Sequence, residues 1–199
     1  MGKTRVRAKK APVQVYQLKV ALRDVQPPVW RRFQVRSDLT LQGLHWALQL
    51  IIGWTDSHLH QFRVARAISG GVRPAHIVEG EDERKVVLAD VLRKPKDRMV
   101  YEYDFGDCWE HVVELEEIAA LPTDAKFPWV LSGERACPPE DVGGPWGYAN
   151  FLEALGDPKH PDHEDLVEWC GDSFDPGAFD VNAINRAFHG GWEPSKRTG

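Results

Sequence analysis

The nine residues YDFGDCWEH, at positions 103–111, bring two aspartates, a cysteine, a glutamate and a histidine together among aromatic side chains. A histidine paired with a carboxylate can act as a general base, and a thiolate beside such a base can act as a nucleophile. His111 is the candidate base, with Asp104 or Asp107 as its carboxylate partner, and Cys137 is a candidate nucleophile. Alternation, however, puts His111 on the same face as a tryptophan and two aliphatic residues. This pattern favours a hairpin tip with a buried, neutral imidazole whose polar atoms are satisfied by a carboxylate.

The short pattern HLH could supply ligands to a metal ion. His58 and His60 stand two apart on a predicted strand, so their imidazoles should point to one face. With His111 from a second strand they would form the three-histidine site of a metal-dependent enzyme. The alternative is that both histidines pack at the end of the sheet, because the next residues, QFRVARA, carry no carboxylate. The spacing alone is a weak signal, so we expect no cofactor and keep this site as an alternative hypothesis.

The stretch CPPEDVGGPWGY, at positions 137–148, combines a rigid backbone with side chains suited to binding. Two prolines restrict the chain, and two glycines allow φ > 0. Such a segment can direct Glu140, Asp141 and Trp146 toward a partner, or it can simply form a corner that covers the sheet. It contains no lysine and no phosphate-loop pattern, which disfavours nucleotide binding.

Acidic residues beside an exposed aromatic ring suit a groove for a basic peptide or partner protein, through ion pairs and cation–π contacts. The leading hypothesis is therefore a binding module that recognises a protein or peptide and has no catalysis that we can name. The candidate groove consists of Asp104, Asp107, Glu140, Asp141, Trp146 and Tyr148.

The composition of the 199 residues predicts one globular domain. Hydrophobic residues make up 42% of the chain and charged residues 28%, which is enough to bury a core. No apolar run approaches the roughly 18–20 residues of a membrane helix, and no secretory signal is present, so we expect a cytoplasmic protein. The three cysteines form no C-x-x-C pair, which indicates reduced thiols.

The net charge of −5 is unevenly distributed, because the first ten residues hold five lysines and arginines. We expect residues 1–13 to form a disordered basic tail, residues 14–190 to form the folded domain, and residues 191–199 to form a flexible tail. The acidic body should repel phosphate backbones. Nucleic acid could therefore bind only through the N-terminal tail, and a DNA-associated factor is the third hypothesis.

Hydrophobic periodicity predicts the secondary structure. Alternation predicts strands in the first half of the chain and a hairpin whose turn is Gly106–Asp107. The 3.6-residue period predicts a long helix that is capped by Thr40 or Asp38 and ends at Gly53. Hairpins followed by late helices predict an α+β fold: a single domain with an antiparallel or mixed sheet covered by helices. The predicted strands are 15–22, 29–36, 58–65, 98–106 and 108–118, and the predicted helices are 37–54, 86–92, 148–155, 162–171 and 180–190.

Several phrases resemble the plasmid pRiA4b Orf-three-like family, which is also labelled as a TnpR-type passenger protein of insertion elements. They are LRDVQPPVWRRFQV, TLQGLHWALQLIIGWTDSHLHQF, YEYDFGDCWEHVVELE, ACPPEDVGGPWGYANFLEAL and WCGDSFDPGAFDVNAIN, spread over about residues 14–189. The resemblance implies one α+β domain found on plasmids and mobile elements, and it implies no established reaction. Val142 stands where relatives often carry cysteine, so a thiol there is not needed. The first serine is Ser37, with no arginine cluster after it, which disfavours the chemistry of a serine resolvase.

Overall fold

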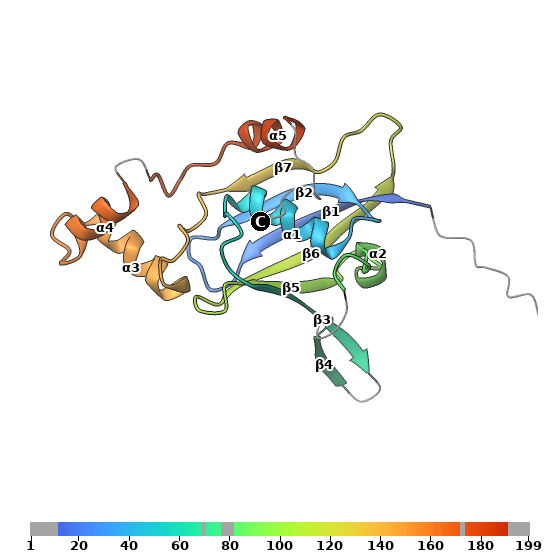
Figure 1. The fold of residues 1–199 in the computed structure, drawn as a ribbon, viewed down its shortest axis with the longest axis horizontal. Helices are drawn as coiled ribbons and strands as arrows, with labels where there is room; N and C mark the ends of the chain where they lie inside the picture. Colours follow the sequence, from blue (N-terminus) through green and yellow to red (C-terminus); the bar gives the residue numbers. More distant parts are fainter. Residues whose placement is uncertain (1–11, 69–70, 77–81, 172–173, 191–199) are drawn as a thin grey trace, which may run out of the picture.

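The computed structural model describes residues 12–68, 71–76, 82–171 and 174–190. Seven strands form one sheet in the order β4-β3-β5-β6-β1-β2-β7, and every pairing is antiparallel (Figure 1). The α+β domain expected from the sequence is confirmed. The strands are β1 (Gln14–Leu22), β2 (Trp30–Arg36), β3 (His60–Ile68), β4 (Gly71–His76), β5 (Arg98–Tyr103), β6 (Trp109–Ala120) and β7 (Trp129–Glu134), and the helices are α1 (Leu41–Ile52), α2 (Leu88–Val91), α3 (Gly144–Gly156), α4 (His163–Cys170) and α5 (Val181–His189).

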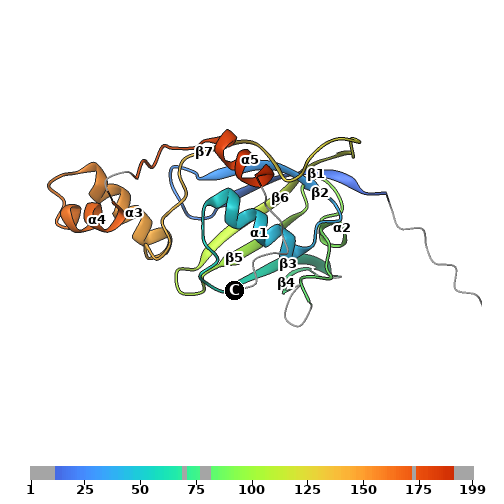
Figure 2. The ribbon, with the colours of Figure 1, turned by 45° about the horizontal axis from the view of Figure 1, so that its top comes forward.

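Helix α1 lies across one face of the sheet (Figures 1 and 2). The helix is shorter than the predicted 37–54, but its caps are among those predicted: the Thr40 hydroxyl accepts a hydrogen bond from the backbone N–H of Gly43, and Gly53 adopts a left-handed φ of 97°. The inward residues of β1, β2, β5 and β6 pack against α1 in one hydrophobic core. The opposite face carries charged pairs such as Arg32 with Glu116, so the sheet is apolar on one side and polar on the other.

The hairpin of β5 and β6 has a longer turn than the sequence predicts. Both strands stop short of Gly106–Asp107, and residues 104–108 form the turn. Asp104 and Cys108 begin and end it in left-handed conformations, with φ of 57° and 55°. Phe105, which alternation places inside, is 47% exposed because it lies in this turn.

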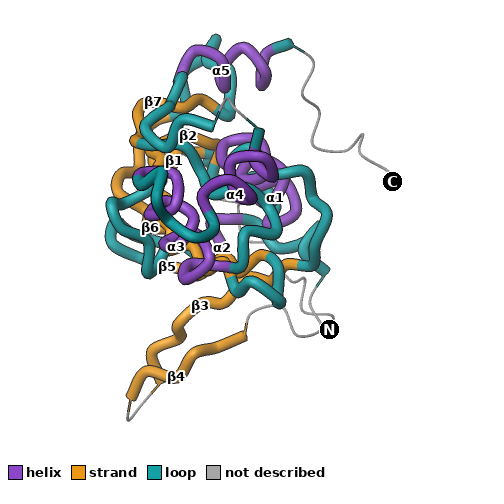
Figure 3. Tube along the Cα trace, turned by 90° about the vertical axis from the view of Figure 1, so that its left-hand side faces the viewer, coloured by secondary structure: helices purple, strands orange, loops and turns teal. Residues whose placement is uncertain are grey.

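The C-terminal helices lie in two places. Helices α3 and α4 extend past the end of the sheet beside the β5–β6 turn, and α5 returns to the edge strand β7 (Figures 1 and 2). The Asp180 side chain caps α5, whereas Asp162 makes no side-chain cap at α4. The hairpin of β3 and β4 projects from the other edge of the sheet (Figure 3).

The two predicted tails lie outside the described residues, except for residues 12 and 13 at the start of the domain. Within the described ranges, no helix has the length and apolar character needed to cross a membrane.

Candidate functional site

The turn at residues 104–108 is stabilised by Asp104. One carboxylate oxygen, Oδ1, accepts hydrogen bonds from the backbone N–H groups of Gly106 at 2.9 Å and Asp107 at 3.4 Å. The backbone carbonyl of Asp104 accepts the N–H of Cys108 at 2.6 Å. The second carboxylate oxygen, Oδ2, is left to face His58. Local hydrogen bonds therefore shape the turn and leave one oxygen for another partner.

The segment before α3 is held against this turn. Oδ2 of Asp107 accepts the N–H of Gly143 at 3.1 Å. Gly144 has a φ of 69°, and a Cβ at this position would lie 2.4 Å from the backbone oxygen of Asp107. Only glycine fits this backbone conformation and this close approach.

Glu140 joins three segments of the chain. Its Oε1 accepts the hydroxyl of Tyr103 at 2.6 Å, and its Oε2 accepts the hydroxyl and the N–H of Thr55 at 2.6 and 3.1 Å. Burial, together with this hydrogen bond, raises the pKa of Tyr103 above its usual value. The carboxylate is thus engaged in structural hydrogen bonds, and it holds the segment before α3 against the loop that follows α1.

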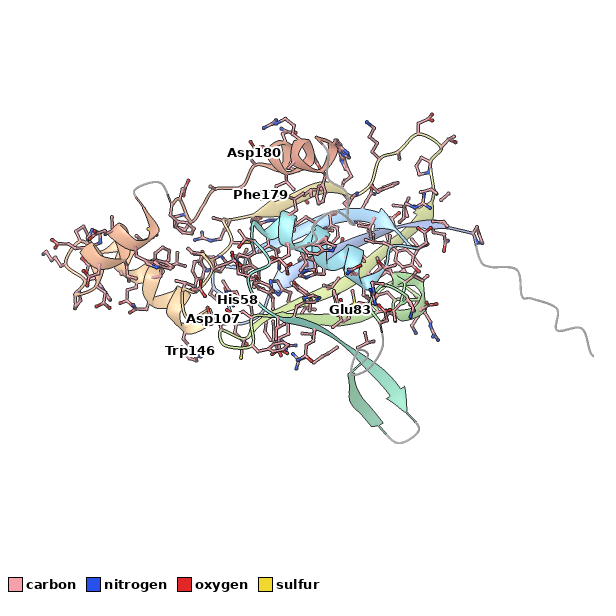
Figure 4. All side chains as sticks on the ribbon, in the orientation of Figure 1. His58, Glu83, Asp107, Trp146, Phe179 and Asp180 are labelled. Carbon is pink, nitrogen blue, oxygen red and sulfur yellow. The ribbon has the colours of Figure 1, made fainter. Side chains whose placement is uncertain are left out.

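His58 lies between two aspartates. Its Nδ1 is 3.6 Å from Oδ2 of Asp104, and its Nε2 is 3.1 Å from Oδ1 of Asp141. The Asp141 side chain is 71% exposed, and its backbone has a φ of 61°. We call these three residues the His58 cluster; His58 and the neighbouring Asp107 are labelled at the end of the sheet in Figure 4.

A groove of 970 Å³ lies on the other side of the turn. Trp146, on its rim, is 89% exposed, and Figure 4 shows it beyond Asp107. Four carboxylates and one guanidinium line it, together with apolar and backbone groups. We call this site the Trp146 groove; its charged residues are Arg23, Asp24, Glu102, Asp107 and Glu110.

The six residues of the predicted groove are divided between these two sites. Asp107, Trp146 and Tyr148 line the Trp146 groove, although Tyr148 is mostly buried in the core. Asp104 and Asp141 belong to the His58 cluster, and Glu140 lies beside it in its structural role. The turn at residues 104–108 separates the two groups.

Sequence reasoning missed three acidic residues of the groove. Asp24 comes from the loop between β1 and β2, and Glu102 and Glu110 stand directly opposite each other on β5 and β6. Both glutamates have even numbers, whereas the buried residues of this hairpin have odd numbers. The alternation therefore predicts that both glutamates lie on the outer face of the sheet.

The structure does not assemble the three-histidine site. His60 stacks on His45, with ring centroids 3.6 Å apart and planes 5° apart, and its Nε2 contacts Glu83 at 3.0 Å. His58 precedes β3 rather than lying on it, so the alternation of a strand does not govern its direction. His111 is fully buried in the core and away from both.

His111 is a structural residue, with partners different from those predicted. Its Nδ1 donates to the backbone carbonyls of Tyr101 and Trp109, each at 3.1 Å, and not to a carboxylate. Burial lowers its pKa to about 4, which keeps the imidazole neutral. Cys137 contacts Nη2 of Arg31 at 3.3 Å, and burial raises the pKa of its thiol to about 11. The predicted base and nucleophile therefore do not form a catalytic pair.

His45, which the sequence did not single out, belongs to a closed ring of hydrogen bonds. The hydroxyl of Tyr101 lies 2.8 Å from Nδ1 of His45, and Nε2 of His45 lies 2.9 Å from Asp56. Gln49 completes the ring, because its side chain donates to Tyr101 and accepts the N–H of Asp56. Burial, and secondarily the charge of His60, lowers the pKa of His45 to about 3. The neutral imidazole fits a structural network better than proton transfer.

Comparison with known proteins supports the family resemblance. The family described as "Plasmid pRiA4b ORF-3-like protein" matches residues 14–183. The chain belongs to this family. A relative of this pRiA4b ORF-3-like protein, the "Uncharacterized protein y4hQ" of Sinorhizobium fredii (strain NBRC 101917 / NGR234), is 42% identical over 177 residues, which cover 87% of this chain and 90% of the relative. The crystal structure of MM3350, a protein of unknown function from Methanosarcina mazei Go1, matches with a TM-score of 0.77 and 38% identity, covering 87% of this chain and 98% of that one.

Proposed function

We propose that this pRiA4b ORF-3-like protein is a non-catalytic binding module whose Trp146 groove takes a cationic peptide segment of a partner protein. The observation that carries the proposal is the nearly complete exposure of Trp146 beside four carboxylates. Large aromatic rings are rarely left in water, and the face of tryptophan attracts ammonium and guanidinium groups. A lysine or arginine side chain on this ring would enter a groove that the carboxylates also line.

The carboxylates of the groove are only partly neutralised. Arg63 bridges Glu102 and Glu110 across the two strands, and Arg23 also pairs with Glu110. Asp24 makes no ion pair with the part of the chain that the structure describes. Exposed ion pairs contribute little stability, so a cation from a partner can displace Arg23 or pair with Asp24 at small cost.

A fluorescently labelled peptide rich in arginine and lysine tests this proposal by its anisotropy. Trp146→Ala should weaken binding about tenfold, the loss expected when a cation–π contact and its buried area are removed. Asp24→Asn should weaken binding less and should reduce its dependence on salt, because one charge of the groove is removed.

Two variants serve as matched controls. Trp169 is 49% exposed on α4, outside the groove, so Trp169→Ala should leave peptide binding unchanged. Asp141 also lies outside the lining, and Asp141→Asn should have no effect. Equal binding by the wild type and Trp146→Ala would overturn the groove proposal.

The family to which the chain belongs also suggests where the protein acts. We infer that the protein is an accessory factor of plasmids or other mobile elements, and the name of its family supports that inference. The cationic partner would then be a protein encoded or used by such an element.

A further inference from the structure

Three potential metal ligands from separate parts of the chain converge in the His58 cluster. His58 precedes β3, Asp104 opens the β5–β6 turn, and Asp141 precedes α3. One ligand atom from each lies within 4.8 Å of the other two. Ligands at about 2.0–2.2 Å from a zinc ion are roughly 3–4 Å apart, so small side-chain adjustments would bring all three onto one ion.

The ligand atoms are available for coordination. Oδ1 of Asp104 serves the turn, whereas Oδ2 faces the imidazole. Nε2 of His58 is buried and finds no hydrogen-bond partner among the described residues, although Oδ1 of Asp141 is only 3.1 Å away. Because this approach lacks hydrogen-bond geometry, it leaves the buried nitrogen of His58 unsatisfied. A cation bound to both atoms would satisfy that nitrogen.

The three ligands are also held in place by contacts that do not involve them. Asp107 binds Gly143, which fixes the segment of Asp141 against the turn of Asp104. Glu140 binds Thr55, which fixes the same segment near the loop of His58. A site whose supporting contacts are already made loses little entropy on binding an ion.

A second group of potential ligands, His45, Asp56 and His60, lacks a geometry that could bind one ion. The imidazoles of its two histidines are stacked in parallel 3.6 Å apart. Nitrogen lone pairs lie in the plane of the ring, so parallel stacked rings cannot direct theirs at one ion. Both nitrogens of His45 also have hydrogen-bond partners. That group is therefore structural.

We propose that His58, Asp104 and Asp141 bind one divalent transition-metal ion, for which Zn²⁺ is the best-suited probe. One imidazole nitrogen and two carboxylates favour Zn²⁺ over Mg²⁺ and Ca²⁺, which prefer oxygen ligands alone. Asp141 is exposed, so the remaining coordination positions open to water. Three protein ligands with an open position are typical of a zinc site that can bind a further molecule.

Isothermal titration of the tag-free, full-length protein with Zn²⁺, after removal of metal by EDTA, tests the site. We expect one Zn²⁺ per chain, and no comparable binding of Mg²⁺. Asp141→Asn and His58→Gln should each weaken Zn²⁺ binding at least tenfold. Asparagine tolerates the left-handed backbone of Asp141, so the first variant removes the charge and keeps the fold.

The control variant is His60→Gln, which should leave Zn²⁺ binding unchanged. Zn²⁺ should raise the thermal unfolding temperature of the wild type and not that of Asp141→Asn, whose unfolding without metal should match the wild type. Trp146→Ala should keep the Zn²⁺ site, which separates this inference from the peptide groove. The inference would be overturned if the wild type showed no stoichiometric binding, or if His58→Gln and Asp141→Asn bound Zn²⁺ as tightly as the wild type.

Discussion

At the scale of single residues, burial decides the chemistry of this protein more than neighbours in the sequence do. His111 and Cys137 look reactive in the sequence, yet His111 is fully buried and Cys137 is half-buried against the core. Loss of solvent disfavours the imidazolium of His111 and the thiolate of Cys137, and it moves both pKa values away from neutral pH in the unreactive direction. His58 and Asp141, by contrast, keep contact with water and remain available to ligands.

The lowered pKa of His111 predicts a specific loss of stability in acid. The unfolded chain takes up a proton on this imidazole near its ordinary pKa of 6.5, whereas the folded chain does so only near pH 4. The free energy of unfolding should therefore fall as pH falls through this window, by about 2 kcal/mol between pH 6.5 and 5 from His111 alone.

Urea unfolding at a series of pH values measures this effect. His111→Gln should reduce the pH dependence between 6.5 and 5, whatever its effect on stability at pH 7. His189→Gln, at an exposed position of α5, serves as the control. An unchanged slope in His111→Gln would show that His111 does not carry the effect.

The cysteines should differ sharply in reactivity. Cys108 is exposed in the turn, whereas Cys137 is half-buried and desolvation raises the pKa of its thiol to about 11, so only about one thousandth of that thiol is ionised at pH 8. Ellman's reagent should modify Cys108 first in the native protein. Cys108→Ser should remove the fast phase and Cys137→Ser should keep it; the reverse pattern would contradict the raised pKa of Cys137.

At the scale of secondary-structure elements, α5 protects an edge of the sheet. The amide side chain of Asn185 binds both polar groups of one residue of β7: it accepts the N–H of Val130 at 2.8 Å and donates to its carbonyl at 2.9 Å. It thus replaces a neighbouring strand at this position. Unpaired edge strands promote association between chains, and covering them prevents it.

Asn185→Ala should destabilise the protein by about 1–3 kcal/mol, because it leaves the buried polar groups of Val130 without partners. It should also increase concentration-dependent association through the exposed edge. Urea unfolding and light scattering after size exclusion measure the two effects. Asn182→Ala, at an exposed position of the same helix, should change neither; a stable and equally monodisperse Asn185→Ala would contradict the role of this residue.

At the scale of the whole molecule, charge separates the N-terminus from the body. The chain carries a net charge of −5 although its first ten residues hold five positive charges. The Trp146 groove concentrates negative charge at one end of the sheet, on the face that α1 does not cover. This distribution suits an acidic body that attracts cations, next to a basic N-terminal segment.

Deletion of residues 1–11 tests whether that tail contacts nucleic acid. The full-length protein should be weakly retained on immobilised DNA at low salt, and the truncated protein should flow through, because an acidic body repels phosphates. The truncated protein should still bind the cationic peptide. Equal retention of both forms would show that any DNA contact lies in the folded domain.

The elements of the fold were predictable because they depend on local periodicity. Alternation identified β1, β2, β3, β5 and β6, and helical spacing identified α5 and α1, the latter with Thr40 as its cap. The sequence did not predict the two edge strands, β4 and β7. The other errors came at the ends of elements, where alternation stops. His58 lies just before β3 and Phe105 lies in the turn after β5. The alternation of the neighbouring strand therefore does not predict the direction of either side chain.

The sequence by itself determined the α+β class, the buried face of the sheet and the types of side chain available for binding. Only the tertiary structure decided which of those side chains meet. The His58 cluster draws on segments up to 83 residues apart and the Trp146 groove on segments still more distant, and such neighbours depend on strand order and on the close contact of Gly144 with Asp107. Periodicity reports the face on which a side chain lies, but it holds no information about the distant segment that packs beside it.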